Sequence, residues 1–381
     1  MSMAEAQPKM DADETQAQPE PKTKAKTDTE ARAGAEGRLG VGVEAEIGAG
    51  EAGTETEAKL ELKAEPKFKS GFVGVLGQTN VGKSTFINTV MGRKVVIVSE
   101  KIQTTRNRIR CIYNDPEAQI VFVDTPGLHK PVNKLSRYLL QQAYGALSGL
   151  DAIAYMVEPW VEVQEYDRAI FDRLREMDLP VILLINKIDL AKGDEVDRTV
   201  ENYQKLGLFQ ELIPISCKEG INIGLAIRTI KKYLPEGPPY FPPEEVTDRP
   251  EEFLIAELVR EQIFRLTYKE IPYSVAVEVI EIRERERERD REREQGQEQG
   301  PGEQPQKPAL IEIYANIYVS RDSQKGIIIG RGGQMIREIG RRAREEIERL
   351  LGAHVYLDLR VKVREDWVED ERQIARLVGG D

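Results

Sequence analysis

Cysteine is scarce in this chain of 381 residues, where Cys111 and Cys217 are the only two and neither belongs to a CxxC pattern. A disulfide framework or a zinc site therefore has almost nothing to build on. Two reduced thiols are the expected state. Long apolar runs are also missing, and none approaches the roughly 20 residues that a membrane-spanning helix needs. With 40% hydrophobic and 32% charged residues, the composition predicts a soluble, cytoplasmic protein.

Residues 1–68 contain almost no large apolar side chains and are rich in Ala, Glu, Lys, Thr, Pro and Gly. Such a segment buries too little apolar surface to offset the entropy lost on ordering, so a disordered tail is predicted. Residues 1–70 hold 10 Lys or Arg and 15 Asp or Glu. Their balance of −5 is nearly half of the chain's net charge of −11. The folded body is therefore less acidic than the total suggests, and a nucleic-acid partner stays open.

Residues 69–234 show short apolar runs separated by helical stretches. The runs lie at 72–77, 120–125, 152–157, 181–186 and 212–216. Runs of this kind are typical of parallel strands that are buried on both faces and joined by crossover helices. The segment is therefore predicted to be a doubly wound α/β domain. Five prolines between Pro235 and Pro243 then predict a stiff, extended linker over residues 235–250.

Residues 251–381 have the pattern of a second, smaller α+β domain. Apolar residues at helical spacing predict a helix over 251–267, and a strand is expected over 273–280. Residues 283–308 alternate in charge and have no apolar face, so they are predicted to be a solvated insertion between two strands. A strand over 310–319, a short helix, a loop at 330–333, a helix from about 334 to 351 and a strand over 355–363 complete the expected order.

A phosphate loop follows the first apolar run and precedes a helix, which is the context that the GxxxxGK[ST] pattern requires. Its glycines let backbone amides point at phosphates, and the helix N-terminus adds positive potential. The lysine is expected on the β and γ phosphates, and the serine hydroxyl is a ligand for Mg²⁺. The loop consists of Gly77, Gln78, Thr79, Asn80, Val81, Gly82, Lys83 and Ser84.

A second motif, DTPG, follows the apolar run at 120–125. Its carboxylate can reach the magnesium ion through water, and its glycine amide can sense the γ phosphate. Between the two motifs lies the polar segment IQTTRNR (102–108), which is suited to a mobile switch. Thr105 is predicted to cap the magnesium ion when GTP is bound, with Thr104 as the alternative. The motif and the residue after it are Asp124, Thr125, Pro126, Gly127 and Leu128.

Two further motifs predict that the base is guanine. A carboxylate at the end of NKID accepts hydrogen bonds from the N1 and N2 donors of guanine, and adenine would leave it unpaired. The lysine would lie along the base, and the asparagine would tie this loop to the phosphate loop. SCK could meet the guanine carbonyl through backbone amides. The residues are Asn186, Lys187, Ile188, Asp189, Ser216, Cys217 and Lys218.

Leu128 occupies the position where many GTPases carry a glutamine that orients the attacking water. Either a partner supplies a catalytic group, or a cation stabilises the charge. Asn80 suits the second explanation, since its amide oxygen could help to bind a potassium ion near the phosphates. The alternative is that Asn80 is a turn residue that tolerates unusual dihedral angles. The residues expected to act in catalysis are Lys83, Thr105, Asn80 and Gly127.

With GQTNVGKS, QTTR, DTPGL, NKID and SCK in the first domain and GIIIGRGGQMIREIG in the second, the chain resembles the Era family of bacterial GTPases from about Phe72 onward. The resemblance implies an α/β P-loop GTPase domain followed by a smaller α+β type II KH domain. GRGG fits the GxxG loop of a KH domain, which lets an RNA backbone approach closely. The residues expected to contact RNA are Lys325, Gly330, Arg331, Gly332, Gly333, Arg337 and Arg341.

The charge around the GxxG loop agrees with an RNA partner. Residues 321–344 contain seven Lys or Arg and only Asp322 and Glu338 as acids, so phosphates would meet a positive field. The resemblance implies a GTPase that acts as a monomer, binds the 3′ end of 16S ribosomal RNA and assists maturation of the 30S subunit. It also implies peripheral association with the inner face of the membrane. Gln78 and Thr79 depart from the family, which usually has Arg and Pro there.

Overall fold

The computed structural model describes residues 67–99, 101, 103–128, 131, 133–163, 165–285 and 310–379. The predicted tail, as far as residue 66, and the predicted insertion from residue 286 to 308 lie outside these residues.

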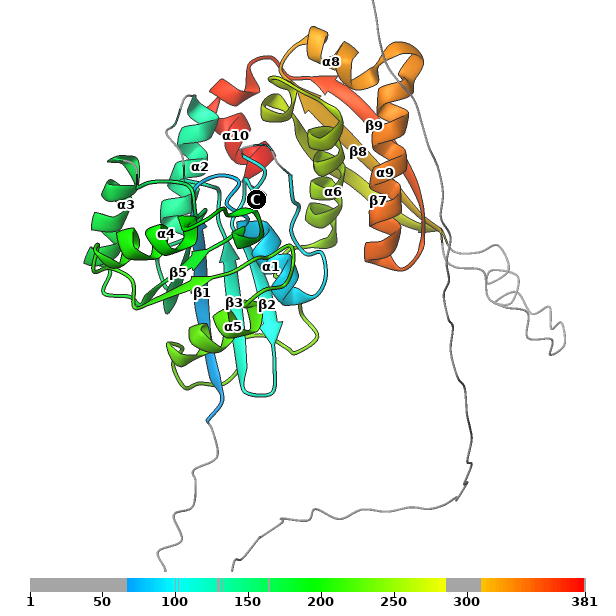
Figure 1. Ribbon diagram of the computed structural model, residues 1–381. Coiled ribbons are helices and arrows are strands. Elements are labelled where there is room, and N and C mark those ends of the chain that lie inside the picture. Colours follow the sequence, from blue (N-terminus) through cyan, green and yellow to red (C-terminus); the bar gives the residue numbers. More distant parts are fainter. Residues whose placement is uncertain are drawn as a thin grey trace, which may run out of the picture. The chain divides into compact units, whose positions relative to one another are not determined.

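A six-stranded sheet with the order β2-β3-β1-β4-β5-β6 organises the first domain (Figure 1). Five strands correspond to the predicted apolar runs and run parallel. They are β1 (Lys69–Gly77), β3 (Ala118–Asp124), β4 (Ala152–Val157), β5 (Val181–Ile185) and β6 (Glu211–Pro214). The edge strand β2 (Ile109–Asn114) was not predicted, and it pairs antiparallel with β3. Its six residues, IRCIYN, include the charged Arg110 and directly follow the polar switch segment, so no separate apolar run is visible in the sequence.

Helices cover both faces of this sheet. The helices α1 (Lys83–Met91) and α5 (Ile223–Lys232) share one apolar core with the sheet. On the other face, α2 (Lys134–Gly145), α3 (Glu165–Glu176) and α4 (Glu195–Gln204) build the second core. Because the carboxyl ends of the five parallel strands meet at one edge, the loops that carry the nucleotide motifs also meet there.

The proline-rich linker is extended, and it is bound along the first domain. Ser70 N donates to Pro235 O at 3.1 Å. Farther along, the side-chain oxygen of Gln119 accepts hydrogen bonds from Tyr240 N at 2.7 Å and Phe241 N at 3.0 Å. Gln119 is fully buried. The linker is therefore fixed to the sheet by backbone hydrogen bonds as well as stiffened by its prolines.

The second domain is built on a three-stranded sheet with the order β7-β8-β9. Strand β7 (Ala276–Arg285) is antiparallel to β8 (Leu310–Val319), and β8 is parallel to β9 (His354–Val363). Helices α6 (Glu251–Leu266) and α9 (Gln334–Leu351) pack against one face of the sheet and close its core. Helix α8 (Asp322–Ile329) leads into the GxxG loop at residues 330–333, whose last three residues form the short helix η3 (Arg331–Gly333).

Strand β7 differs from the prediction at both ends. Residues Ile271–Ser274 form a short helix, η2, so the strand begins at Ala276 instead of residue 273. It then continues to Arg285, inside the segment predicted to be an insertion from residue 283. The reason is pairing, because Arg283 lies opposite Glu312 and Arg285 lies opposite Leu310 in the register with β8.

A C-terminal helix, α10 (Glu371–Val378), was not predicted. Asp370 begins it by accepting hydrogen bonds from Arg372 N at 2.9 Å and Gln373 N at 3.1 Å, a common N-terminal cap. A short helix, η4 (Trp367–Glu369), precedes it. A small apolar core joins these two elements to α2 and to the sheet of the second domain. Its buried members are Leu135, Leu139, Ala276, Tyr318, Trp367, Ile374 and Val378.

Candidate nucleotide site and nucleic-acid interface

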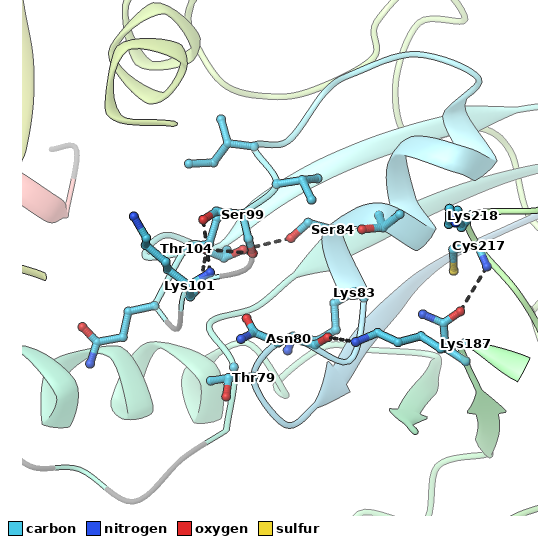
Figure 2. A pocket seen from close by; sticks show the side chains of 18 of the residues that line it. Thr79, Asn80, Lys83, Ser84, Ser99, Lys101, Thr104, Lys187, Cys217 and Lys218 are labelled. Carbon is cyan, nitrogen blue, oxygen red and sulfur yellow. Dashed lines mark hydrogen bonds between the residues drawn. The ribbon is translucent and has the colours of Figure 1, made fainter. Parts of the chain in front are cut away.

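A pocket of about 570 Å³ opens at the carboxyl edge of the first sheet (Figure 2). Its lining comes from the phosphate loop, from residues 97–99, 101 and 103–105, from Gly127 and from the two predicted base-binding segments. The structure thus brings together all four nucleotide motifs, which lie up to about 140 residues apart in the sequence. A volume of this size is typical of a site for a small organic ligand.

The phosphate loop has the backbone that its glycines were expected to allow. Gly77 and Gly82 have φ angles of 139° and 103°, which L side chains rarely adopt. A Cβ atom on Gly82 would lie 2.3 Å from the side-chain nitrogen of Asn186. Lys83 is 6% exposed, and its Nζ donates to Gly77 O at 3.1 Å and to Gln78 O at 2.7 Å. Burial lowers the pKa of Lys83 to about 8, so a phosphate group would stabilise its charge.

The side chain of Gln78 turns away from the pocket. Its Nε2 lies 3.1 and 2.9 Å from the two carboxylate oxygens of Asp167 on α3. Tyr155 OH donates to the same carboxylate at 3.3 Å, and Asp167 is buried. Asp167 therefore anchors the phosphate loop to α3, and sequence reasoning missed it because nothing in the helix pattern distinguishes this carboxylate.

Three oxygen atoms converge where the magnesium ligands were predicted. Ser84 Oγ lies 3.1 Å from Thr105 Oγ1 and donates to Asp124 Oδ2 at 3.0 Å, and Thr105 Oγ1 donates to the same Oδ2 at 3.1 Å. Thr104 is placed differently, since its hydroxyl donates to Lys101 O at 2.6 Å. The geometry thus brings Thr105, and not Thr104, to Ser84 and Asp124.

The environment of Asp124 fits a divalent cation. Its Oδ1 is buried and has no hydrogen-bond partner among the described residues. Burial raises the pKa of Asp124 to about 6, although Lys83 and the two hydroxyls oppose this shift. Mg²⁺ prefers such hard oxygen ligands. Ser84, Thr105 and Asp124 would hold the ion, which when bound neutralises charge on the β and γ phosphates.

Close packing ties the DTPG motif to the phosphate loop. A Cβ on Gly127 would lie 2.7 Å from the Thr79 methyl and 3.0 Å from Thr79 Cα, so only glycine fits there. Leu128 N donates to Gly77 O at 3.2 Å, and the Leu128 side chain is 3% exposed in the core. A side chain in this position cannot orient water.

Asn186 joins the base-binding loop to two other segments. Its Nδ2 donates to Val81 O at 2.7 Å, and its Oδ1 accepts from Cys217 N at 3.0 Å. The Asn186 side chain is 2% exposed, so both bonds are shielded from water. The Asn186 amide therefore links the phosphate loop, NKID and SCK to one another.

Neighbouring groups also fix the two charged residues of NKID. Ser216 Oγ donates to Asp189 Oδ1 at 2.6 Å, so this serine acts through its hydroxyl, a role that sequence reasoning did not assign. Lys187 Nζ donates to Asn80 O at 2.8 Å and pairs with Glu158. Glu158 was also missed, although its position directly after β4 places it at the functional edge of the sheet. Asn80 is exposed and has a φ angle of 65°, as a turn residue would.

The GRGG loop between α8 and α9 depends on glycine at three positions. Gly330, Gly332 and Gly333 have φ angles of 71°, 58° and 75°. A Cβ on Gly330 would lie 2.6 Å from the Cβ of Met335, so a side chain there would clash with α9. Arg337 closes the loop by donating to Gly332 O at 2.5 Å and to Gly333 O at 3.2 Å.

The positive field around this loop is weaker than the sequence count indicated. Arg341 forms a two-bond contact with Glu338, at 2.8 and 3.0 Å, and a third bond to Glu345 at 2.6 Å. Arg342 also donates to Glu338 at 2.6 Å. Exposed ion pairs of this kind contribute little free energy, so phosphates can displace the carboxylates. Arg331 is exposed and Lys325 is half-buried.

A phosphate loop, a set of magnesium-type ligands and an NKID loop on an α/β sheet, joined to a GxxG loop between two helices, define the class as a P-loop GTPase with a KH domain. Residues 72–187 match the family described as 50S ribosome-binding GTPase, and residues 302–368 match the KH domain. The predicted fold class is thereby confirmed.

Two solved structures extend the similarity over most of the chain. A variant of Era from Aquifex aeolicus bound to GDP and AlF4⁻ is 37% identical, with a TM-score of 0.72. Era in complex with MgGDPNP and nucleotides 1506–1542 of 16S ribosomal RNA is 36% identical, with the same TM-score. Each comparison covers 82% of this chain and 99% of the other. The chain therefore belongs to the Era family of GTPases.

Proposed function

We propose that this GTPase is a molecular switch that binds the 3′ end of 16S ribosomal RNA through its KH domain and assists 16S processing and 30S subunit biogenesis. The observation that carries the proposal is that one chain contains both a pocket lined by the guanine-nucleotide motifs and a GxxG loop whose three glycines have positive φ angles. The Era complex that holds nucleotides 1506–1542 of 16S ribosomal RNA supports the same partner.

Within the pocket we propose the following roles. Lys83 binds the β and γ phosphates, and Ser84, Thr105 and Asp124 hold Mg²⁺. Asp189 accepts from guanine. Lys83→Ala should abolish measurable GTP turnover in the presence of Mg²⁺. Undiminished turnover would refute the assigned role, and absence of turnover in the unaltered protein would favour a constitutive RNA-binding protein with a structural nucleotide site.

The charge that assists hydrolysis must come from a group other than residue 128, because Leu128 is buried in the core. We propose that potassium supplies it, held in part by the Asn80 side chain, as an alternative to a group from a partner. Turnover should be faster in potassium than in sodium, and Asn80→Ala should remove the difference. Equal rates in both salts would leave the partner as the source of the charge.

The nucleotide state is proposed to control RNA binding. GTP would order the segments around Thr105 and Gly127, and their rearrangement would change how the KH domain meets RNA. Binding of a 16S fragment is measured by fluorescence anisotropy with GDP and with a non-hydrolysable GTP analogue. Identical affinities in the two states would refute coupling through affinity.

The ribosomal subunit is tested separately. The family description of the first domain names the 50S subunit, but that match ends before the KH domain, which carries the RNA contacts proposed above. Crosslinking and sequencing of RNA bound in cells should recover the 3′ end of 16S ribosomal RNA. Recovery of 23S ribosomal RNA or transfer RNA instead would assign the protein to large-subunit assembly or to RNA modification.

The division of the chain and its location remain proposals. We assign residues 69–234 to the GTPase domain, 235–250 to the linker and 251–381 to the KH domain. A monomeric state and peripheral association with the inner membrane are proposed from the family resemblance. Among the described residues, no helix combines the length and the apolar character that crossing a bilayer requires. Light scattering and flotation with lipid vesicles test these two points.

A further inference from the structure

The backbone that precedes Thr105 lies against α6, the first helix of the KH domain. Arg260 on this helix donates to Thr104 O at 2.5 Å. Glu261, one residue further, accepts from Val98 N at 3.1 Å. Lys101 donates to two backbone carbonyls at the C-terminal end of the same helix. Three positions before Thr105, namely Val98, Lys101 and Thr104, therefore have hydrogen-bond partners in the KH domain.

Arg106 makes the corresponding contact on the other side of Thr105. Its side chain is almost fully buried, and it donates to Val275 O at 2.6 Å and Pro272 O at 2.9 Å, both in the KH domain. The guanidinium carbon lies 5.8 Å from the ring centroid of Phe264 and 6.0 Å from that of Trp367. The hydrogen-bond acceptors and the aromatic rings that contact the Arg106 guanidinium thus all come from the second domain.

Arg106 and Arg260 lie near the same carboxylate, that of Glu257, which Arg260 binds. Arg260 binds Glu257 through two hydrogen bonds of 2.7 and 2.5 Å. Burial, and then the Arg260 charge, lower the pKa of Arg106, while Glu257 raises it. Arg106 Nε and Arg260 Nη1 find no acceptor within the described part of the chain. Buried charges with incomplete partners contribute little to stability, so a role in fixing geometry is the better explanation of this arrangement.

Thr105 lies between these two anchors. The carbonyl before it is held by Arg260, and the side chain after it is held by carbonyls of the KH domain, while its own hydroxyl faces Ser84 and Asp124. Fixing both neighbours restricts the dihedral angles that direct the Thr105 hydroxyl. The metal-ligand geometry of the GTPase domain is therefore set in part from the KH domain.

We propose that Arg106 and Arg260 are positioning residues for GTP hydrolysis, which hold Thr105 in its metal-binding position from the KH domain. This inference rests on the proposed role of Thr105 as a magnesium ligand. It is independent of any effect of nucleotide on RNA affinity. Without either arginine, Thr105 would reach the metal in a smaller fraction of molecules, so turnover should fall and more Mg²⁺ should be needed.

The experiment measures GTP turnover of the full chain, without RNA, as a function of Mg²⁺ concentration. Arg106→Met keeps the side-chain stem and removes the donors. Arg260→Lys keeps the charge beside Glu257 but cannot hold both partners. We expect kcat to fall about tenfold, with several times more Mg²⁺ at half-maximal turnover and GDP affinity within about twofold. Arg349→Met is the matched control, because Arg349 is exposed on α9 and pairs with Glu346 on its own helix.

Thr105→Ala separates the possible outcomes. If this variant turns over GTP normally, Thr105 is not a magnesium ligand in the reaction, and the positioning role of the two arginines is refuted as well. If Thr105→Ala is impaired while both arginine variants match Arg349→Met, the positioning role alone is refuted. A parallel loss of kcat, GDP affinity and thermal stability in both arginine variants would also refute it, because the arginines would then only maintain the fold.

Discussion

Replacing Asn186 by alanine tests how much of the nucleotide site depends on one side chain. The carboxamide links Val81 O to Cys217 N, with hydrogen bonds of 2.7 and 3.0 Å. Val81 and Cys217 are themselves 4% and 5% exposed. Alanine would leave both partners buried, with water largely excluded.

The expected magnitude follows from these two partners. A buried polar group left without its hydrogen bond costs about 1 to 3 kcal/mol. Two such groups predict a loss of about 2 to 5 kcal/mol in the free energy of unfolding, since the small cavity lets some water enter. For a domain of this size, such a loss corresponds to a fall in Tm of roughly 5 to 15 °C. Affinity for GDP should also fall, because the phosphate and base loops would lose this buried link and keep the more exposed contact of Lys187 Nζ with Asn80 O.

Thermal unfolding and fluorescent GDP titration of the Asn186→Ala variant provide the measurement. Asn202→Ala is the control, since Asn202 is exposed on α4 and the same change there should alter stability by less than about 0.5 kcal/mol. If Asn186→Ala lowers the Tm and the GDP affinity no more than the control does, the two hydrogen bonds do not hold the loops together and the reasoning is wrong.

Three further outcomes are expected. Asp189→Asn should weaken the binding of GTP and favour the binding of xanthosine triphosphate, whose extra carbonyl pairs with an amide. Competition between the two nucleotides measures this preference, and an unchanged preference would show that Asp189 does not recognise the base. Gly330→Ala should weaken RNA binding without affecting GTP turnover, because its Cβ would clash with Met335; RNA titration decides, and normal affinity would contradict the clash. Burial raises the pKa of the Cys111 thiol, and it raises the pKa of the Cys217 thiol to about 12. At pH 8 both thiols should therefore resist alkylation until the protein unfolds. Rapid labelling of the native protein would refute their burial.

The local chemistry of the GTPase domain could be predicted from the sequence, because each motif is continuous in the chain. A glycine-rich turn followed by Lys83 has one well-known use when a strand precedes it and a helix follows. The five parallel strands were recognisable because burial on both faces requires uninterrupted apolar residues. The GxxG loop was likewise visible, since its glycines are adjacent.

Elements that depend on distant partners could not be predicted in this way. Residues 109–114 form strand β2 because they pair with β3. Strand β7 extends into a charged segment because β8 lies opposite it. Arg341 contributes to a positive patch in the sequence, but Glu345 lies one helical turn away and pairs with it. In each case a partner outside the motif decides the outcome.

The sequence by itself determined the type of nucleotide site and the presence of the second domain, since these depend on residue types at short spacing. The tertiary structure decided how the site is held. It placed Thr105, and not Thr104, beside Asp124, and it buried Arg106 in the KH domain. Two adjacent threonines and one polar arginine look alike in a sequence, and only long-range packing gives each side chain its direction.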